Sequence, residues 1–167
     1  MKIAVDSCSL ILLAKATVLE KLADRYSLFI SEVVYKEVME GKIKKFIDSL
    51  LTERLVKENK IRVNGIKSAE LTKKLEEDFS LGVGEAETLS LILNKDCDII
   101  LTDNKQGRKT AIIYDLDLIG SVEVVVSLYK LKVIDKNKAI DALKKLREFG
   151  WFQDYLIDNA LEEVKNE

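Results

Sequence analysis

Two aspartates in this sequence each follow a short apolar run. Ile3-Ala4-Val5 precedes Asp6, and Ile99-Ile100-Leu101-Thr102 precedes Asp103. Continuous β-branched runs of this length are typical of strands that are buried on both faces of a sheet. Ligands of open α/β sheets bind beyond the carboxyl ends of the strands. The tips of adjacent parallel strands lie roughly 5 Å apart, so the two carboxylates are expected to be able to share a cation.

Three glutamates are candidates to join these aspartates. Glu85 follows Gly82-Val83-Gly84, a predicted flexible break, at the start of an apolar helix. Glu87 points about 200° away from Glu85 around a helix of 3.6 residues per turn, so only one of them easily faces the same site. Glu37 lies in a helix whose valines place it on or beside a buried face, where an acid needs a partner.

The residue types restrict the chemistry. The chain has no histidine, which excludes a Ser-His-Asp triad, a Cys-His pair and a His-ligated zinc site. Converging carboxylates form a hard-oxygen site that favours Mg²⁺ or Mn²⁺ over zinc. Such ions can hold a phosphodiester and lower the pKa of an attacking water. Thr102 and Asn104 are expected to add hydrogen bonds at the rim, while Arg108 and Lys109 contact phosphate.

Short strands that alternate with helices predict a parallel sheet covered by helices. We expect strands at residues 2–6, 27–31, 60–64, 98–103 and 117–119. We expect helices at 8–16, 18–23, 32–40, 42–59, 68–79, 86–94, 104–114, 121–131, 138–149 and 154–164. Gly41 is expected to end the helix 32–40. In the segment 42–59, the three- and four-residue spacing predicts a buried face made of Ile43, Phe46, Ile47, Leu50, Leu51 and Leu55.

The composition is typical of a folded enzyme-sized chain. With 167 residues, 47% apolar and 34% charged, we expect a single domain over 1–167, in which 121–167 form C-terminal helices. No apolar run reaches a membrane span, and no signal peptide is expected. Cys8 and Cys97 lack metal-ligand spacing and are expected to be reduced, buried thiols of a cytoplasmic protein. The net charge of −2 exerts no overall pull on nucleic acid.

In addition to these patterns, the chain resembles the PIN-domain (PilT N-terminus) nucleases. The resemblance rests on Ile3–Leu10, the Glu37 helix, Gly84–Leu89, and Leu101–Asn104 leading to Arg108, in that order over nearly the whole chain. It implies a three-layer α/β/α sandwich with a short central parallel sheet. It also implies Mg²⁺- or Mn²⁺-dependent cleavage of single-stranded or structured RNA.

The resemblance also implies roles for individual residues. Asp6, Glu37, Glu85 and Asp103 match the four acids of the family and are expected to be catalytic. Many relatives have Asp-Ala where this chain has Glu85-Ala86, so Glu87 competes for the third position. Asp6, Glu85 and Asp103 are expected to hold the metal. Contacts to substrate are expected from Ser7, Thr102, Asn104 and Arg108. Features after Gly120 are similar to an archaeal and bacterial branch related to toxin–antitoxin ribonucleases, which implies a possible antitoxin-like partner; small enzymes also commonly form a homodimer.

Each candidate residue also has a purely structural interpretation. The two aspartates could cap the following helices, although Ser7 and Ser9 are available for the first cap. Glu85 and Glu87 could complement a helix dipole, and Arg108 could pair with a nearby acid. Trp151 and Phe152 are expected to cover the core or form an interface rather than stack on bases. The alternative function is a non-catalytic PIN-fold module that binds RNA or protein. A magnesium-dependent phosphatase is disfavoured, because Cys8 stands where its second acid would be.

Overall fold

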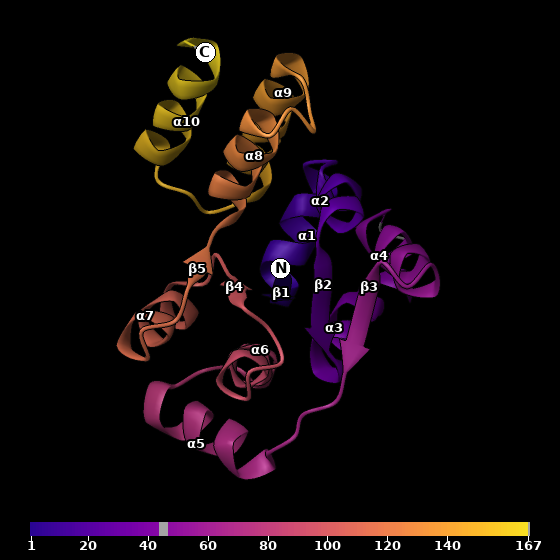
Figure 1. Cartoon of the computed structure of the whole chain (residues 1–167), viewed down its shortest axis with the longest axis vertical. Helices are drawn as coiled ribbons and strands as arrows, with labels where there is room; N and C mark the ends of the chain where they lie inside the picture. The colour runs from indigo at the N-terminus through magenta and orange to yellow at the C-terminus, as the bar shows by residue number, and fades with distance from the viewer. Residues whose placement is uncertain (44–46, 167) are drawn as a thin grey trace.

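The central feature of the computed structural model, which describes residues 1–43 and 47–166, is one parallel β-sheet (Figure 1). Its strands are β1 (Lys2–Val5), β2 (Ser27–Ser31), β3 (Ile61–Asn64), β4 (Ile99–Leu101) and β5 (Leu118–Ile119). They form a five-stranded sheet in the order β3-β2-β1-β4-β5, and every neighbouring pair is parallel. All five expected strands are therefore present, and β1 and β4 are neighbours.

Helices connect the strands and cover the sheet. Those described are α1 (Ser7–Lys15), α2 (Leu19–Arg25), α3 (Glu32–Ile43), α4 (Ile47–Lys57), α5 (Ala69–Phe79), α6 (Val83–Leu93), α7 (Lys105–Ile113), α8 (Ser121–Lys130), α9 (Lys136–Phe149) and α10 (Asp154–Asn166). In Figure 1, α8, α9 and α10 lie together at the top, and α5 and α6 lie at the bottom. None of the helices in the described part of the chain is long and apolar enough to cross a membrane.

The sheet separates two hydrophobic cores. Strand residues alternate between them, as a period of two requires. Ile3, Val5, Leu28, Ile30 and Leu101 face the core that includes residues of α1, α2, α3, α4, α8, α9 and α10. Ala4, Phe29 and Ile100 face the smaller core of α5, α6 and α7. This arrangement confirms the three-layer α/β/α sandwich, and it explains the uninterrupted apolar runs because both faces of each strand are covered.

Two glycine-based expectations were wrong. Helix α3 continues through Gly41 to Ile43. Helix α6 begins at Val83, so Gly82 is its N-cap residue and Gly84 lies within its first turn. The helix extends this far because the Glu85 carboxylate accepts a hydrogen bond from the backbone N–H of Gly82 at 3.0 Å, which satisfies a donor that would otherwise lack a partner inside the helix.

The buried face of α4 also differs from the expected one. Ile47 is 82% exposed and Leu50 is 46% exposed, whereas the buried face consists of Asp48, Ser49, Thr52 and Leu55. The Thr52 hydroxyl donates to the Asp48 carbonyl oxygen at 2.8 Å, so its burial leaves no unsatisfied donor. The helix packs against α1 and α3. The Ile43 side chain and Phe46, also expected on this face, lie outside the described residues.

Candidate active site

Asp6 lies at the carboxyl end of β1, directly beside the end of β4. Val5 is in register with Leu101 in the neighbouring strand, and the Asp6 N–H donates to the Leu101 carbonyl oxygen at 3.2 Å. The Asp6 side chain is only 2% exposed. The predicted juxtaposition of the two acid-ending strands is therefore present, and it follows from the sheet order β1-β4.

Both carboxylate oxygens of Asp6 accept hydrogen bonds. The Ser9 N–H donates to Oδ1 at 2.7 Å, and the Thr102 hydroxyl donates to Oδ2. Asp6 is thus the N-cap residue of α1, so the expectation that Ser7 or Ser9 serves as the cap was wrong. An extended residue with a short acceptor side chain suits this position, and it orients the carboxylate without excluding a second role.

Burial raises the pKa of Asp6 from its ordinary 3.8 to about 6. Hydrogen bonds from Thr102 and Ser9 oppose this shift, and the nearby charge of Asp103 adds to it. No ion pair involves Asp6 within the described residues. Asp6 is therefore a buried acid whose ionised form lacks a cationic partner, which is an arrangement that a bound cation would stabilise.

Asp103 is held by two serines. Its Oδ1 accepts from the Ser121 N–H at 2.9 Å, and its Oδ2 accepts from the hydroxyls of Ser121 and, at 2.9 Å, Ser9. The Asp103 N–H in turn donates to the Ser9 hydroxyl at 2.9 Å. Ser9 therefore bridges the two aspartates, with its N–H on Asp6 and its hydroxyl on Asp103. Sequence reasoning considered Ser9 only as a cap and missed Ser121, whose signal was its place directly after Gly120 at a helix start.

Asn104, rather than Asp103, caps α7. Its Oδ1 accepts from the Gln106 N–H at 2.8 Å and from the Gly107 N–H at 2.9 Å. This capping leaves the Asp103 side chain directed toward Ser9 and Ser121. It also occupies the amide oxygen of Asn104, which was expected to contact substrate.

Glu85 belongs to the same electrostatic environment as the two aspartates. The Cys8 thiol, on the first turn of α1, is exposed to solvent rather than buried as expected. Its pKa is raised to about 11 by partial burial and then by the charges of Asp6, Asp103 and Glu85. The charges of all three carboxylates therefore act on the first turn of α1.

Glu87 points elsewhere, as the helical geometry predicted. Its side chain is 7% exposed, and its Oε2 accepts from the Val33 N–H in the first turn of α3 at 3.3 Å. Beside it, the Ser31 hydroxyl oxygen accepts from the Val34 N–H at 3.1 Å. Glu87 thus joins α6 to the N-terminus of α3, whereas the Glu85 carboxylate accepts from the Gly82 N–H at the start of α6.

Glu37 lies against the first turn of α6. Its side chain is exposed and lies beside the buried face that Val34 and Val38 form. A Cβ atom on Gly84 would lie 2.9 Å from each Glu37 carboxylate oxygen, so the glycine makes room for this acid. The N-terminus of a helix favours a negative charge at this place. Glu37 of α3 and Glu85 of α6 therefore both lie at the N-terminus of α6.

Of the residues expected to bind substrate, Thr102 is buried, whereas the others are partly exposed: Ser7, Asn104 and Arg108. The Thr102 hydroxyl oxygen also accepts from the Asn104 N–H at 3.2 Å, so it positions Asp6 rather than facing solvent. Ser7 is partly exposed on α1. Arg108 donates from Nη1 to the Thr102 carbonyl oxygen at 3.2 Å, and its Nη2 pairs with Glu123 at 3.5 Å. Arg108 thus sits beside Asp103 but already has an acidic partner.

The carboxylates present could supply part of the coordination shell of Mg²⁺ or Mn²⁺. Hard carboxylate oxygens of Asp6 and Asp103 lie at the ends of adjacent strands, where Ser9 joins them, and the raised pKa of Asp6 reflects an uncompensated acid. Within the described residues, no three Asp, Glu, Cys or His side chains are grouped closely enough to hold an ion as a set. Mg²⁺ commonly uses one or two carboxylates and takes its other ligands from water and substrate phosphate. The residues present fit that kind of incomplete shell.

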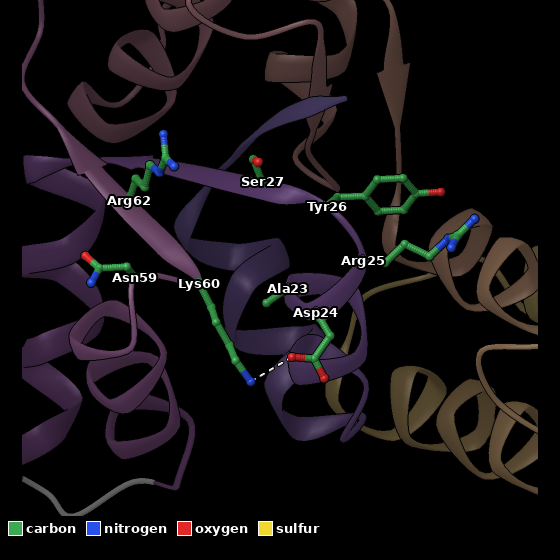
Figure 2. Close-up of a pocket in the computed structure, with 8 residues that line it drawn as sticks. All are labelled: Ala23, Asp24, Arg25, Tyr26, Ser27, Asn59, Lys60 and Arg62. Carbon is green, nitrogen blue, oxygen red and sulfur yellow. Dashed lines mark ion pairs between the residues drawn. The ribbon is translucent and has the colours of Figure 1, made fainter.

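The carboxyl ends and the amino ends of the strands each adjoin a cavity. A groove of about 910 Å³ begins at Asp103 and runs along α7, α8 and α10. A smaller cavity of about 310 Å³ lies at the amino ends of β2 and β3 (Figure 2). There the Lys60 amine pairs with Asp24 at 2.7 Å. The carboxyl edge, with its acids and the adjoining groove, is therefore the candidate active site.

The chain was compared with known proteins. A family model described as a PIN domain matches residues 2–166. The searches of curated proteins and of solved structures found no match. The match covers nearly the whole chain, including both aspartate-ending strands, α3 with Glu37 and α6 with Glu85. On this evidence, the chain belongs to the PIN-domain family.

Proposed function

We propose that this protein is a metal-dependent ribonuclease that hydrolyses RNA phosphodiester bonds. The PIN-domain family implies a nuclease-like fold, commonly that of metal-dependent ribonucleases. The observation that most strongly supports activity in this chain is the pair of buried Asp6 and partly buried Asp103, bridged by Ser9 at the ends of adjacent strands. Burying an ionised acid beside another acid costs stability, and such costs are concentrated at functional sites.

In this proposal Asp6, Asp103 and Glu85 hold Mg²⁺ or Mn²⁺. The ion supplies charge stabilisation at the phosphate and a lowered pKa for the attacking water. The protein supplies orientation: Ser9 and Thr102 hold the Asp6 carboxylate, and Ser121 holds that of Asp103. Arg108 contacts a phosphate next to the cleaved bond. Glu37, exposed beside the first turn of α6, completes the set of catalytic acids.

The decisive experiment measures Mn²⁺-dependent cleavage of end-labelled single-stranded RNA by the wild type, Asp6→Asn and Asp103→Asn. Each change removes a charge at nearly constant shape. We expect a loss larger than the ten- to hundred-fold typical of residues that only support metal ligands. Asp117→Asn is the matched control, because Asp117 is exposed just before β5, at the opposite edge of the sheet. Full activity of Asp6→Asn would refute the proposal.

A non-catalytic module that binds RNA or protein is the second candidate. It is favoured by the hydrogen-bonding of both aspartates, since every carboxylate oxygen of Asp6 and Asp103 already accepts from the protein. Calorimetric titration of Mn²⁺ into the wild type and Asp6→Asn separates the candidates. Mn²⁺ binding that the variant loses supports the ribonuclease, whereas RNA binding without metal binding or cleavage supports the module.

Three further expectations stay predictions. An antitoxin-like partner is tested by co-purification from the native host, and a homodimer by sedimentation equilibrium. Localisation in the cytoplasm is tested by cell fractionation.

A further inference from the structure

The groove of about 910 Å³ that starts at Asp103 is lined largely by apolar side chains, with exposed lysines of α7 and exposed aromatic residues among them. We propose that it binds a single strand of RNA that extends from the cleaved bond. Bases stack on Trp151 and Tyr155, and phosphates pair with Lys105 and Lys109. This inference rests on the proposed ribonuclease function and specifies how its substrate is held.

The aromatic rim is created by the turn between α9 and α10. A Cβ atom on Gly150 would lie 2.3 Å from the Phe152 ring, so only glycine allows that ring to fold back over position 150. Phe152 packs against the main core. Trp151, between them, is fully exposed, and Tyr155 is 57% exposed on the first turn of α10. Trp151 therefore does not cover the core, which was one of the two roles expected for it beside forming an interface, and its ring lies open on the rim of the groove.

The charges of the groove favour a polyanion. Its acids other than Asp103 are paired, Glu123 with Arg108 at 3.5 Å and Glu163 with Lys130. Lys105 and Lys109 are exposed and one helical turn apart on α7, so they share a face. Neither forms an ion pair within the described residues. In a chain of net charge −2, this leaves an uncompensated positive wall beside the candidate active site.

Continuity with Asp103 favours RNA over other ligands. A strand that lies in the groove reaches the acids at its end, whereas a neutral apolar peptide would leave both lysines unpaired. A second copy of this chain, docked by two-fold symmetry, would bring the same two lysines to the groove, so like charges would meet. Aromatic stacking combined with phosphate contacts is the usual way of holding single strands without sequence preference, because every base has a π-face.

Trp151 is the only tryptophan of the chain, so its fluorescence reports on this site alone. The experiment titrates a single-stranded RNA oligonucleotide into the full chain in EDTA, where no cleavage occurs. Tryptophan fluorescence and the anisotropy of a labelled copy are both followed. We expect quenching and anisotropy to share one midpoint. Trp151→Ala should weaken binding about five- to hundred-fold, the range of one base–aromatic stack.

Matched variants separate the contributions. The double variant Lys105→Ala/Lys109→Ala should lower the slope of log affinity against log salt by about 1.4, since each phosphate contact of a single strand adds about 0.7. Phe149→Ala is the aromatic control, because Phe149 is 44% exposed and lies outside the groove. Lys144→Ala is the control for charge. Neither control should change the affinity more than two-fold, and circular dichroism should show that all variants are folded.

Four other outcomes would overturn the groove assignment, and a fifth would overturn the ribonuclease proposal alone. Anisotropy changes without quenching, or unaltered by Trp151→Ala, would place RNA elsewhere and leave the ribonuclease proposal standing. Equal competition by duplex RNA would exclude stacking. No binding, together with a dimer that Trp151→Ala dissociates, would make the groove an interface between copies. No binding and no dimer would also refute it. Quenching in a protein that never cleaves RNA would support the groove and refute the ribonuclease instead.

Discussion

Replacing Asp6 by asparagine should stabilise the protein in the absence of metal. The wild-type carboxylate is buried and ionised at pH 8, and its pKa is raised to about 6. Asparagine has nearly the same shape, carries no charge and is an equally good N-cap, so the hydrogen bond from the Ser9 N–H is retained. We expect this cost because active sites often keep a charge that function requires although it destabilises the fold.

The size of the effect follows from the pKa shift. A rise from 3.8 to about 6 corresponds to about 3 kcal/mol of destabilisation once Asp6 is ionised. With its oxygen kept on the Ser9 N–H, asparagine places its NH₂ group where Oδ2 accepts from the Thr102 hydroxyl. An NH₂ group cannot accept, and the lost hydrogen bond offsets about 1 kcal/mol. We therefore expect Asp6→Asn to raise the unfolding free energy at pH 8 by about 2 kcal/mol, or the melting temperature by about 4–8 °C.

The pH dependence has a defined sign. Because the folded-state pKa is above the unfolded one, the folded protein holds the proton more tightly. The contribution of this proton to the free energy of unfolding is complete below pH 3.8 and is lost as the pH rises through about 6. The advantage of Asp6→Asn over the wild type should therefore be largest above pH 7 and small near pH 4.

Urea denaturation in EDTA at pH 8 and pH 4.5, with Asp117→Asn as the control, measures this difference. Adding Mn²⁺ at pH 8 should then stabilise the wild type and leave Asp6→Asn unchanged, because binding to the folded state raises its stability. A variant less stable than the wild type at pH 8, or a difference independent of pH, would refute the reasoning. In that case, the hydrogen bonds to Asp6 outweigh the cost of burying its charge.

The other predictions concern the supports of the site. Gly120→Ala places a Cβ atom 2.9 Å from Asp103 Oδ1. We expect the cleavage rate to fall at least ten-fold while the free energy of unfolding changes by no more than about 1 kcal/mol. Unaltered cleavage kinetics would contradict this. Glu85→Gln should reduce the cleavage activity and barely change the melting temperature. Glu87→Gln should keep the activity and lower the free energy of unfolding by about 0.5–1 kcal/mol, because its charge lies at the N-terminus of α3. The reverse pattern would exchange their roles. Ser9→Ala removes the hydroxyl that bridges to Asp103 and should cost about 1–3 kcal/mol, measured by denaturant unfolding.

Local patterns made most of the fold predictable. Apolar runs of strand length separated by helical periodicity led to all five strands and their order of appearance. The proximity of Asp6 and Asp103 was predictable, because each ends such a run and parallel strands end at the same edge of a sheet. The divergence of Glu85 and Glu87 followed from helix geometry alone.

Features that depend on partners distant in the sequence were not predictable. The face that α4 buries, with Ser49 and Thr52 inside and Ile47 outside, depends on how α1 and α3 approach it, and hydropathy alone favoured the opposite face. Gly41 could not be seen to lie inside a helix, because packing of neighbouring residues can outweigh the intrinsic preference of one glycine.

The sequence by itself determined the order of strands and helices, the layer architecture and the acids at the strand ends, because these depend on residue type and spacing along one segment. Only the tertiary structure decided that Ser9 and Ser121 hold the acids and that Thr102 is turned inward. It also decided that Trp151 lies open on a groove leading to Asp103. The physical reason is that hydrogen bonds and exposure are set by atoms about a hundred residues away, such as those of Ser9 and Asp103 (94 positions apart), which approach only once the sheet has formed.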